Sequence, residues 1–349
     1  MQNSTTKKSL LNIIYCVATA AFCIFALYPI TTNAVTSYIA VGDRPISSNL
    51  IGVKLYVMNY YSNNVSVVNT ITNTTVATIS VGTNPQFATL SGTKLYVNSA
   101  VDATISVIDT ATDTVSSTIP IASVSTNSTL VGSKIYVNSN AGNTVSVIDT
   151  ATDTVSSTVT VGTNPFSSTL VGSDLYVTNV GSDNVSVIDT NTDMVTGTIT
   201  VGDAPYFSTL VGAELYVTNL NGNTVSVINT ATNTVTDTII VGTAPHGINK
   251  NGTSVYVVNI NGGGVSIIDT STKTVIESIS AGIHPYLATL VGNKLYVQDL
   301  NGPDITVINT DTNTLATSIN ISIGQYTSTL VGTNLYVNIP DGNVIYVVD

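Results

Sequence analysis

The chain has 349 residues, of which 43% are hydrophobic and only 8% are charged, where soluble domains usually have about a quarter. The formal net charge is −11, and the 9 lysines and arginines form no basic cluster. Because counterion release requires clustered basic side chains, this composition argues against nucleic acid as a partner.

The N-terminal 34 residues have the pattern of an export signal. Lys7 and Lys8 precede an uncharged stretch from Ser9 to Ile30, and small residues follow at Thr32-Asn33-Ala34. We therefore predict that residues 1–34 are a signal peptide. The apolar stretch, residues 9–30, is longer than most signal cores, so an uncleaved anchor is the alternative, and only this alternative predicts a membrane contact. In both cases the protein is expected outside the cytoplasm, secreted or at the cell surface.

From residue 35 onward the chain repeats itself every 40 residues. A Tyr-Val pair recurs eight times at this spacing, and a glycine stands four residues before each tyrosine. The tyrosines are Tyr56, Tyr96, Tyr136, Tyr176, Tyr216, Tyr256, Tyr296 and Tyr336. A fixed period of this length is typical of solenoids and propellers, in which every repeat is one supersecondary unit.

One unit, taken from Pro165 to Pro205, predicts an antiparallel meander of four short strands. Its β-rich segments, separated by turn residues, are Phe166–Leu170, Leu175–Asn179, Val185–Asp189 and Met194–Val201. Gly172 stands in the first turn, where a positive φ is expected. No segment beyond residue 34 shows the 3.6-residue apolar period of a helix.

The ends of the repeat region predict a closed ring. The middle strands are apolar on both faces, so each sheet needs neighbours on both sides, as in a propeller. Residues 35–41 match a fourth strand without its first three, and the unit that ends at Asp349 lacks its fourth. Pairing the two leaves no free edge, whereas an open solenoid would need capping units that are not apparent. We predict an all-β, closed eight-bladed β-propeller, a single domain spanning residues 35–349.

The repeats resemble the YVTN-type β-propeller repeat. The quartets Tyr176–Asn179 and Tyr216–Asn219 carry the resemblance, together with the frame at Thr230–Val235 and Val241–Gly247. It extends over residues 35–349 and implies exported or surface proteins of bacteria and archaea, surface-layer-like proteins among them, mostly without an assigned biochemical role. Val131-Gly132-Ser133 stands where the family often has Pro-Asp-Gly, which alters that turn and leaves the fold expected unchanged.

Few residues are available for catalysis. Beyond residue 34 the chain has two histidines, His246 and His284, two glutamates, and no cysteine or tryptophan. Propeller enzymes with haem, copper or quinone cofactors draw on His, Cys or Trp, so we expect no cofactor, no metal site and no catalytic residue. The alternative is an extracytoplasmic hydrolase or lyase with its site at the mouth of the central channel, in which a histidine serves as base.

Asp-Thr-Ala-Thr-Asp runs at residues 109–113 and 149–153 raise the question of calcium. Each run offers two carboxylates four residues apart, whereas calcium takes several converging oxygens. Aspartate and threonine also favour turns, because their side chains bond to the nearby backbone. We therefore interpret these runs as turns.

One repeat position predicts a binding site. The residue that follows the repeat proline, or the residue in its place, carries a ring in five consecutive units: Phe166, Tyr206, His246, Tyr286 and Tyr326. In a propeller this position begins the innermost strand near the channel mouth. A one-sided aromatic arc suits stacking on sugars or gripping a partner loop, although the rings could also simply fill space between inner strands. We predict a non-catalytic binding or structural module with a protein or glycan partner at this face.

Overall fold

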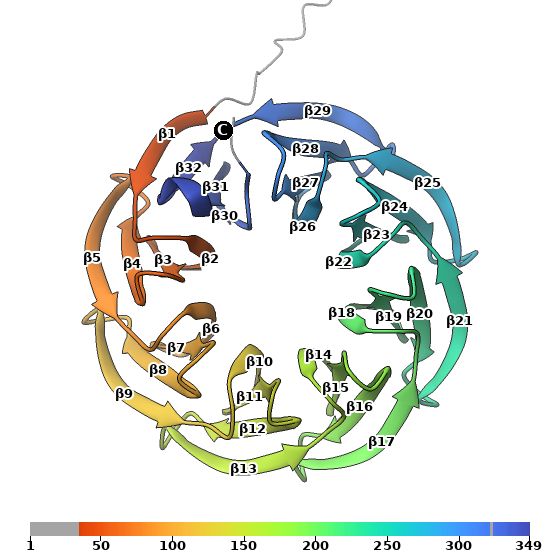
Figure 1. Ribbon diagram of the computed structural model, residues 1–349, viewed down its shortest axis with the longest axis horizontal. Helices are drawn as coiled ribbons and strands as arrows, with labels where there is room; N and C mark the ends of the chain where they lie inside the picture. The colour runs from red at the N-terminus through yellow and green to blue at the C-terminus, as the bar shows by residue number, and fades with distance from the viewer. Residues whose placement is uncertain (1–34, 322–323) are drawn as a thin grey trace, which may run out of the picture. The chain divides into compact units, whose positions relative to one another are not determined.

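The computed structural model describes residues 35–321 and 324–349, and it confirms the predicted propeller (Figure 1). Eight four-stranded antiparallel sheets stand as blades around a central axis. In every blade the first strand of the meander is innermost and the last is outermost. The predicted signal peptide or anchor, residues 1–34, lies outside the described residues.

The strand bounds follow the 40-residue period. The first two blades are β2 (Pro45–Ile51), β3 (Lys54–Asn59), β4 (Asn64–Asn69), β5 (Thr74–Ser80), and β6 (Pro85–Ser91), β7 (Lys94–Ser99), β8 (Thr104–Asp109), β9 (Thr114–Pro120). The third and fourth are β10 (Ser125–Val131), β11 (Lys134–Ser139), β12 (Thr144–Asp149), β13 (Thr154–Thr160), and β14 (Pro165–Val171), β15 (Asp174–Asn179), β16 (Asn184–Asp189), β17 (Met194–Thr200). The fifth and sixth are β18 (Pro205–Val211), β19 (Glu214–Asn219), β20 (Thr224–Asn229), β21 (Thr234–Ile240), and β22 (Pro245–Asn251), β23 (Ser254–Asn259), β24 (Gly264–Asp269), β25 (Thr274–Ser280). The last two are β26 (Pro285–Val291), β27 (Lys294–Asp299), β28 (Asp304–Asn309), β29 (Thr314–Asn320), and β30 (Ser328–Val331), β31 (Asn334–Ile339), β32 (Val344–Val348), β1 (Val35–Ala40).

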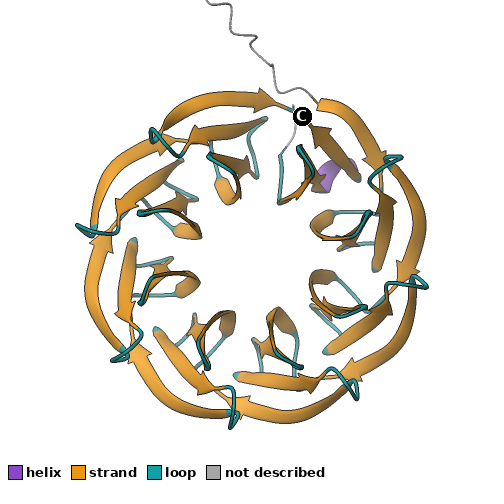
Figure 2. Cartoon of the chain, turned by 180° about the vertical axis from the view of Figure 1, so that it is seen from behind, coloured by secondary structure: helices purple, strands orange, loops and turns teal. Residues whose placement is uncertain are grey.

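Local sequence explains the turns between these strands. Gly172, at the end of β14, has φ +61°, and a Cβ placed there would meet no atom within 4 Å. The glycine is therefore required by the backbone conformation and not by lack of space. Among the described residues the helical structure is a single three-residue 3-10 turn, η1 (Pro340–Gly342), coloured purple in Figure 2. Within this part of the chain no helix is long and apolar enough to cross a membrane.

The core lies between neighbouring blades. Tyr136 and Val147 of the third blade, for example, pack against Leu175, Val177 and Ile188 of the fourth, all essentially without exposed surface. Such clusters recur around the ring, because the two middle strands of each blade are apolar on both faces. A blade therefore depends on its neighbours for most of its burial.

The ring closes through the chain termini, as predicted. β1 pairs antiparallel with β32, with Val35 opposite Val348 and Ile39 opposite Ile345. The backbone N–H of Val41 also donates to the carbonyl oxygen of Asn343 at 3.0 Å. Ile39 is 3% exposed, and its cluster includes residues of both the last and the first blade. The N-terminal strand thus completes the eighth blade and covers its edge.

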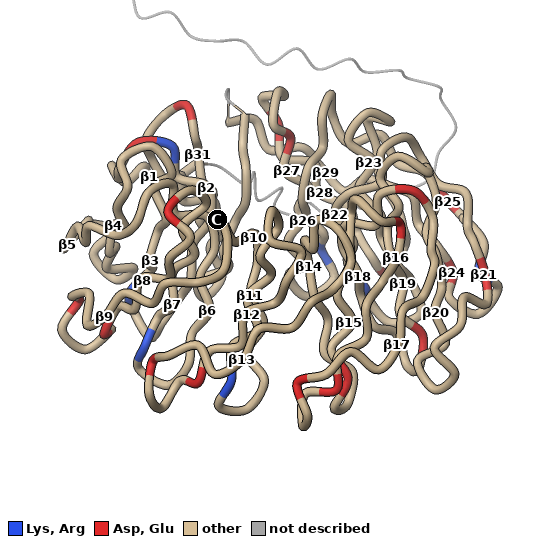
Figure 3. The backbone as a smooth tube through the Cα atoms, turned by 60° about the horizontal axis from the view of Figure 1, so that its bottom comes forward, with Lys and Arg blue, Asp and Glu red and all other residues tan. Residues whose placement is uncertain are grey.

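Polar clasps link neighbouring blades at the turns between the two outer strands. In the second blade Lys94 Nζ lies 2.7 Å from Asp153 Oδ2 of the third, and the Tyr96 hydroxyl donates to Asp153 Oδ1 at 2.5 Å. Lys54–Asp113 and Lys134–Asp193 repeat this pair. Between the fifth and sixth blades the charges are reversed, with Glu214 Oε1 2.7 Å from Lys273 Nζ. Figure 3 shows that the charged residues are few and lie mainly in turns.

These clasps account for the Asp-Thr-Ala-Thr-Asp runs. The first carboxylate of a run bonds to its own turn, since Asp109 Oδ1 accepts from the backbone N–H of Ala111 at 2.8 Å. The second carboxylate binds the lysine and tyrosine of the preceding blade, as Asp113 does with Lys54 and Tyr56. Across residues 35–321 and 324–349 no group of three His, Cys, Asp or Glu side chains is placed to hold a metal ion.

The reversed pair suggests a charge-swap test of the clasp. Lys94→Glu puts a second carboxylate beside Asp153 and is expected to lower the free energy of unfolding by about 1 kcal/mol, at the upper end of the values for pairs that remain in contact with solvent. Adding Asp153→Lys recreates the arrangement of Glu214 and Lys273, with the acid on the preceding blade and the lysine on the following one. The double variant is expected to recover most of the lost free energy of unfolding. A double-mutant cycle in urea measures the coupling. Additive single effects, with no rescue in the double variant, would contradict this role.

Candidate functional site

The five ring residues predicted from the repeat stack on one another as a continuous aromatic arc. Ring centroids are 3.9 Å apart for Phe166 and Tyr206, 4.7 Å for Tyr206 and His246, and 4.3 Å for His246 and Tyr286. Tyr286 and Tyr326 follow at 4.9 Å, with their hydroxyl oxygens 3.2 Å apart. Tilted stacks at such distances are attractive. Phe166, Tyr206, His246 and Tyr286 begin inner strands, and Tyr326 lies two residues before β30.

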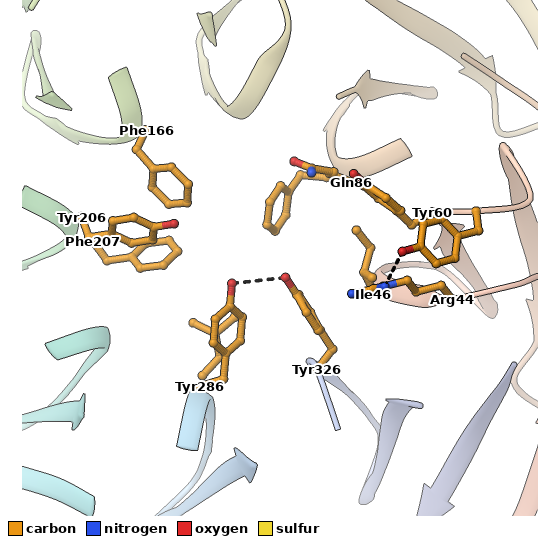
Figure 4. A pocket seen from close by; sticks show the side chains of 12 residues that line it. Arg44, Ile46, Tyr60, Gln86, Phe166, Tyr206, Phe207, Tyr286 and Tyr326 are labelled. Carbon is orange, nitrogen blue, oxygen red and sulfur yellow. Dashed lines mark hydrogen bonds between the residues drawn. The ribbon is translucent and has the colours of Figure 1, made fainter. Parts of the chain in front are cut away.

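The arc forms one side of a cavity of about 280 Å³ at the centre of the ring, which we call the mouth cavity (Figure 4). Four of the five predicted residues line it: Phe166, Tyr206, Tyr286 and Tyr326. All inner strands begin at this end of the axis, because every blade is the same meander. Residues at one repeat position therefore gather here from distant parts of the chain.

His246 is part of the wall and does not line the mouth cavity. It is 2% exposed, and its Nδ1 lies 3.1 Å from the backbone carbonyl oxygen of Tyr286. Burial lowers the pKa of His246 to about 4, although that hydrogen bond acts in the opposite direction. The imidazole is therefore neutral near pH 7, with Nδ1–H as the donor to the carbonyl. A neutral ring enclosed between two tyrosines is poorly placed to act as a base on a ligand.

The opposite side of the mouth cavity was not anticipated from the sequence. Arg44, the only arginine of the chain, lies there with Tyr60 and Tyr61 from the turn after β3. The Arg44 guanidinium donates to the Tyr61 hydroxyl at 2.6 Å, and its carbon is 4.8 Å from the Tyr61 ring centroid and 5.9 Å from that of Tyr60. Gln86 and Phe207 also line the cavity. A comparison of the turn positions among repeats would have singled out these residues.

The mouth cavity combines one positive charge with neutral phenols. Among its described lining residues Arg44 is the one charged side chain. Burial raises the pKa of Tyr206 to about 12 and also moves the pKa of Tyr286 above its usual range. These hydroxyls therefore stay protonated and serve as hydrogen-bond donors and acceptors. The arrangement can bind an anionic group and stack or cover a ring.

No protein-family model and no curated protein matches this chain. Similar solved structures include the computationally designed Ika8 protein, with 10% identity, a TM-score of 0.76 and coverage of 90% of this chain and 99% of that one. BamB from Moraxella catarrhalis has 15% identity, a TM-score of 0.70 and coverage of 91% and 99%. The dihydro-heme d1 dehydrogenase NirN in complex with DHE has 13% identity, a TM-score of 0.73 and coverage of 90% and 76%. At these identities the likeness shows the fold alone, and on that ground the chain is an eight-bladed β-propeller.

Proposed function

We propose that this protein is a non-catalytic binding module that works outside the cytoplasm, with its binding site in the mouth cavity. We further propose that it belongs with the exported and surface proteins built from YVTN-type repeats, residues 1–34 being its signal peptide or anchor. Its partner is a protein or a glycan held at the cavity. The observation that carries this proposal is that the otherwise regular repeats differ at the positions that line the mouth cavity.

The aromatic arc is not required by the blade itself. Thr126 and Gln86 occupy the same repeat position as Phe166 in blades with the same strands. The Tyr-Val pair and the turn glycine, in contrast, recur in every unit because the blade core and the turn need them. Variable positions that converge on one cavity of an otherwise regular ring favour recognition over packing.

The cavity chemistry supports binding over catalysis. A hydrolase or lyase would need an acid and a base facing the substrate. His246 is enclosed in the wall, and His284 lies outside the lining, with its Nδ1 3.0 Å from Asn301 Nδ2. Guanidinium, amide and high-pKa phenol groups bind well but exchange protons poorly near pH 7.

Affinity capture from the envelope of the producing cell tests this proposal. The variant Phe166→Thr/Tyr206→Thr/Phe207→Asn copies Thr126 and Asn127 of the third blade into two further blades, so the fold is expected to survive. The control Val53→Thr/Ile71→Ala changes exposed turn residues at the end of the central axis opposite the mouth cavity. It introduces the residues found at the equivalent positions of the second blade, Thr93 and Ala111. We expect a partner that the wild type and the control retain and the triple variant loses.

Two outcomes would count against the proposal. Retention of the partner by the triple variant would place binding elsewhere on the ring. Turnover of a polysaccharide or ester substrate by the wild type, abolished by His284→Gln, would favour the hydrolase or lyase instead.

A further inference from the structure

We propose that the ligand of the mouth cavity is an acidic sugar, a uronic acid whose carboxylate binds Arg44 while its ring lies against the aromatic arc. This inference rests on the proposed function and specifies its ligand class. Three features carry it: an unpaired guanidinium, an apolar wall facing it, and several neutral polar groups between the two.

The Arg44 guanidinium has N–H donors available for a ligand. A guanidinium has five N–H donors, and one of them bonds within the protein, to the Tyr61 hydroxyl. In the described part of the chain Arg44, like Lys250 and Lys294, has no carboxylate within 4 Å, whereas Lys54, Lys94, Lys134 and Lys273 have ion pairs. Arginine binds carboxylates through two parallel hydrogen bonds, so a ligand carboxylate fits the free donors.

The backbone does not call for arginine at this position. Arg44 has φ 57°, in the left-handed region, and the equivalent residues Asn84 and Asn164 have φ 55°. Asparagine tolerates that conformation better than most residues. Contact with the rings of Tyr60 and Tyr61 then holds the guanidinium at the cavity. The arginine at position 44 is therefore explained by its guanidinium group at the cavity and not by its backbone conformation.

The wall opposite Arg44 suits the face of a sugar ring. Figure 4 shows Phe166, Tyr206 and Phe207 across the cavity from Arg44, with Tyr286 and Tyr326 pointing toward the space between. The C–H face of a pyranose packs on aromatic surface, as apolar groups do generally. A cavity of about 280 Å³ is at the small end of ligand sites and suits one or two sugar rings.

The polar groups distinguish a sugar acid from other small acids. The Gln86 amide and the hydroxyls of Tyr206, Tyr286 and Tyr326 all belong to side chains that line the cavity. Hydroxyl groups of a sugar can pair with them, whereas an aromatic acid would leave the Gln86 amide and the Tyr206 hydroxyl without a ligand partner at a cost, since the Tyr286 and Tyr326 hydroxyls already bond to each other. A neutral sugar would leave the desolvated guanidinium without a counter-charge.

Titration calorimetry of the purified full chain tests the inference with matched ligands. D-galacturonic acid and D-glucuronic acid are compared with galactose and glucose, which have CH₂OH in place of the carboxylate. N-benzoylglycine serves as an aromatic acid. We expect a uronic acid to bind about tenfold or more tighter than its neutral counterpart, as a charge-assisted hydrogen-bond pair allows.

Arg44→Asn is the decisive variant. It copies Asn84 and Asn164 at the same backbone conformation, so an unchanged melting temperature is expected. Uronic acid affinity should fall about tenfold or more, to the level of the neutral sugar, whose affinity should not change. Arg44→Lys, which keeps the charge and loses the planar fork, should lie in between.

Several results would overturn the inference. They are binding of neither uronic acid, equal binding of acid and neutral sugars, an Arg44→Asn variant that binds uronic acid as well as the wild type, or tighter binding of N-benzoylglycine than of both uronic acids. None of these results bears on the proposed function, which is tested separately by partner capture with the Phe166/Tyr206/Phe207 variant and by the turnover assay with His284→Gln.

Discussion

Deleting residues 35–42 from the full chain is expected to lower the melting temperature by about 10 °C or more and to promote aggregation. The deletion removes β1, which pairs with β32 at residues some 300 positions away, and it opens the cluster around Ile39 that joins the last blade to the first. The loss therefore exceeds that of one short strand, because it exposes a sheet edge and breaks the seam between the first and last blades. Without closure, repeats unravel from their ends.

Removing a whole internal period is the matched control for this deletion. Deletion of residues 166–205 takes out one blade's worth of chain but leaves β1 and β32 complementary. That protein is expected to close as a seven-bladed ring and to lose less stability, although more residues are gone. Differential scanning calorimetry of both proteins gives the comparison. An unchanged melting temperature after loss of residues 35–42 would show that the termini do not hold the ring together.

His246 is expected to make the protein acid-sensitive between about pH 6.5 and pH 4. Its pKa is about 4 in the folded protein because of burial, against about 6.5 in the unfolded chain. Between these values the unfolded chain binds a proton that the folded protein does not, so stability is complete above pH 6.5 and falls as the pH is lowered. A fall of the His246 pKa from about 6.5 to about 4 on folding corresponds to about 3 kcal/mol of unfolding free energy lost across this pH range.

His246→Phe keeps a ring in the aromatic arc and removes the titration. Urea unfolding at several pH values is expected to show that this variant loses about 3 kcal/mol less than the wild type over the window. His284→Gln, at the other histidine of the described residues, is the control and is expected to keep the acid sensitivity of the wild type. If wild type and His246→Phe lose equal stability, the imidazole is not buried as described.

The sequence predicted the fold almost completely because the repeat supplied eight aligned copies of one blade. Strands predicted at Phe166–Leu170 and Leu175–Asn179 correspond to β14 and β15 within a residue or two. The split unit also predicted the pairing of β1 with β32. The strand positions and the β1–β32 pairing both follow from the register of the 40-residue repeat. Insertions or deletions between repeats would have obscured that register.

The site was predicted in part. Adjacency of the arc residues follows from their shared repeat position, but the burial of His246 depends on the rings on either side of it. A bulge between Pro205 and Ser208 breaks the alternation of the inner strand, so Tyr206 and Phe207 both reach the cavity. Strand periodicity does not predict this.

Arg44 was missed for a different reason. It lies in a turn before β2, and Tyr60 lies in a turn after β3, so only hairpin pairing brings them together. The backbone N–H of Tyr60 donates to the Arg44 carbonyl oxygen at 2.9 Å. Neither turn belongs to the position at which the aromatic arc is visible in the sequence.

Hydroxyl-radical footprinting of the protein, alone and with its captured partner, shows whether the partner binds at the mouth cavity, because it reports the solvent access of individual tyrosines and phenylalanines. We predict that the partner slows oxidation of Tyr60, Tyr61, Phe207 and Tyr326 at the mouth cavity. Tyr38, which is 74% exposed on β1 at the outer surface, should react at an unchanged rate. Protection of Tyr38 without protection of the cavity residues would contradict a binding site at the mouth of the ring.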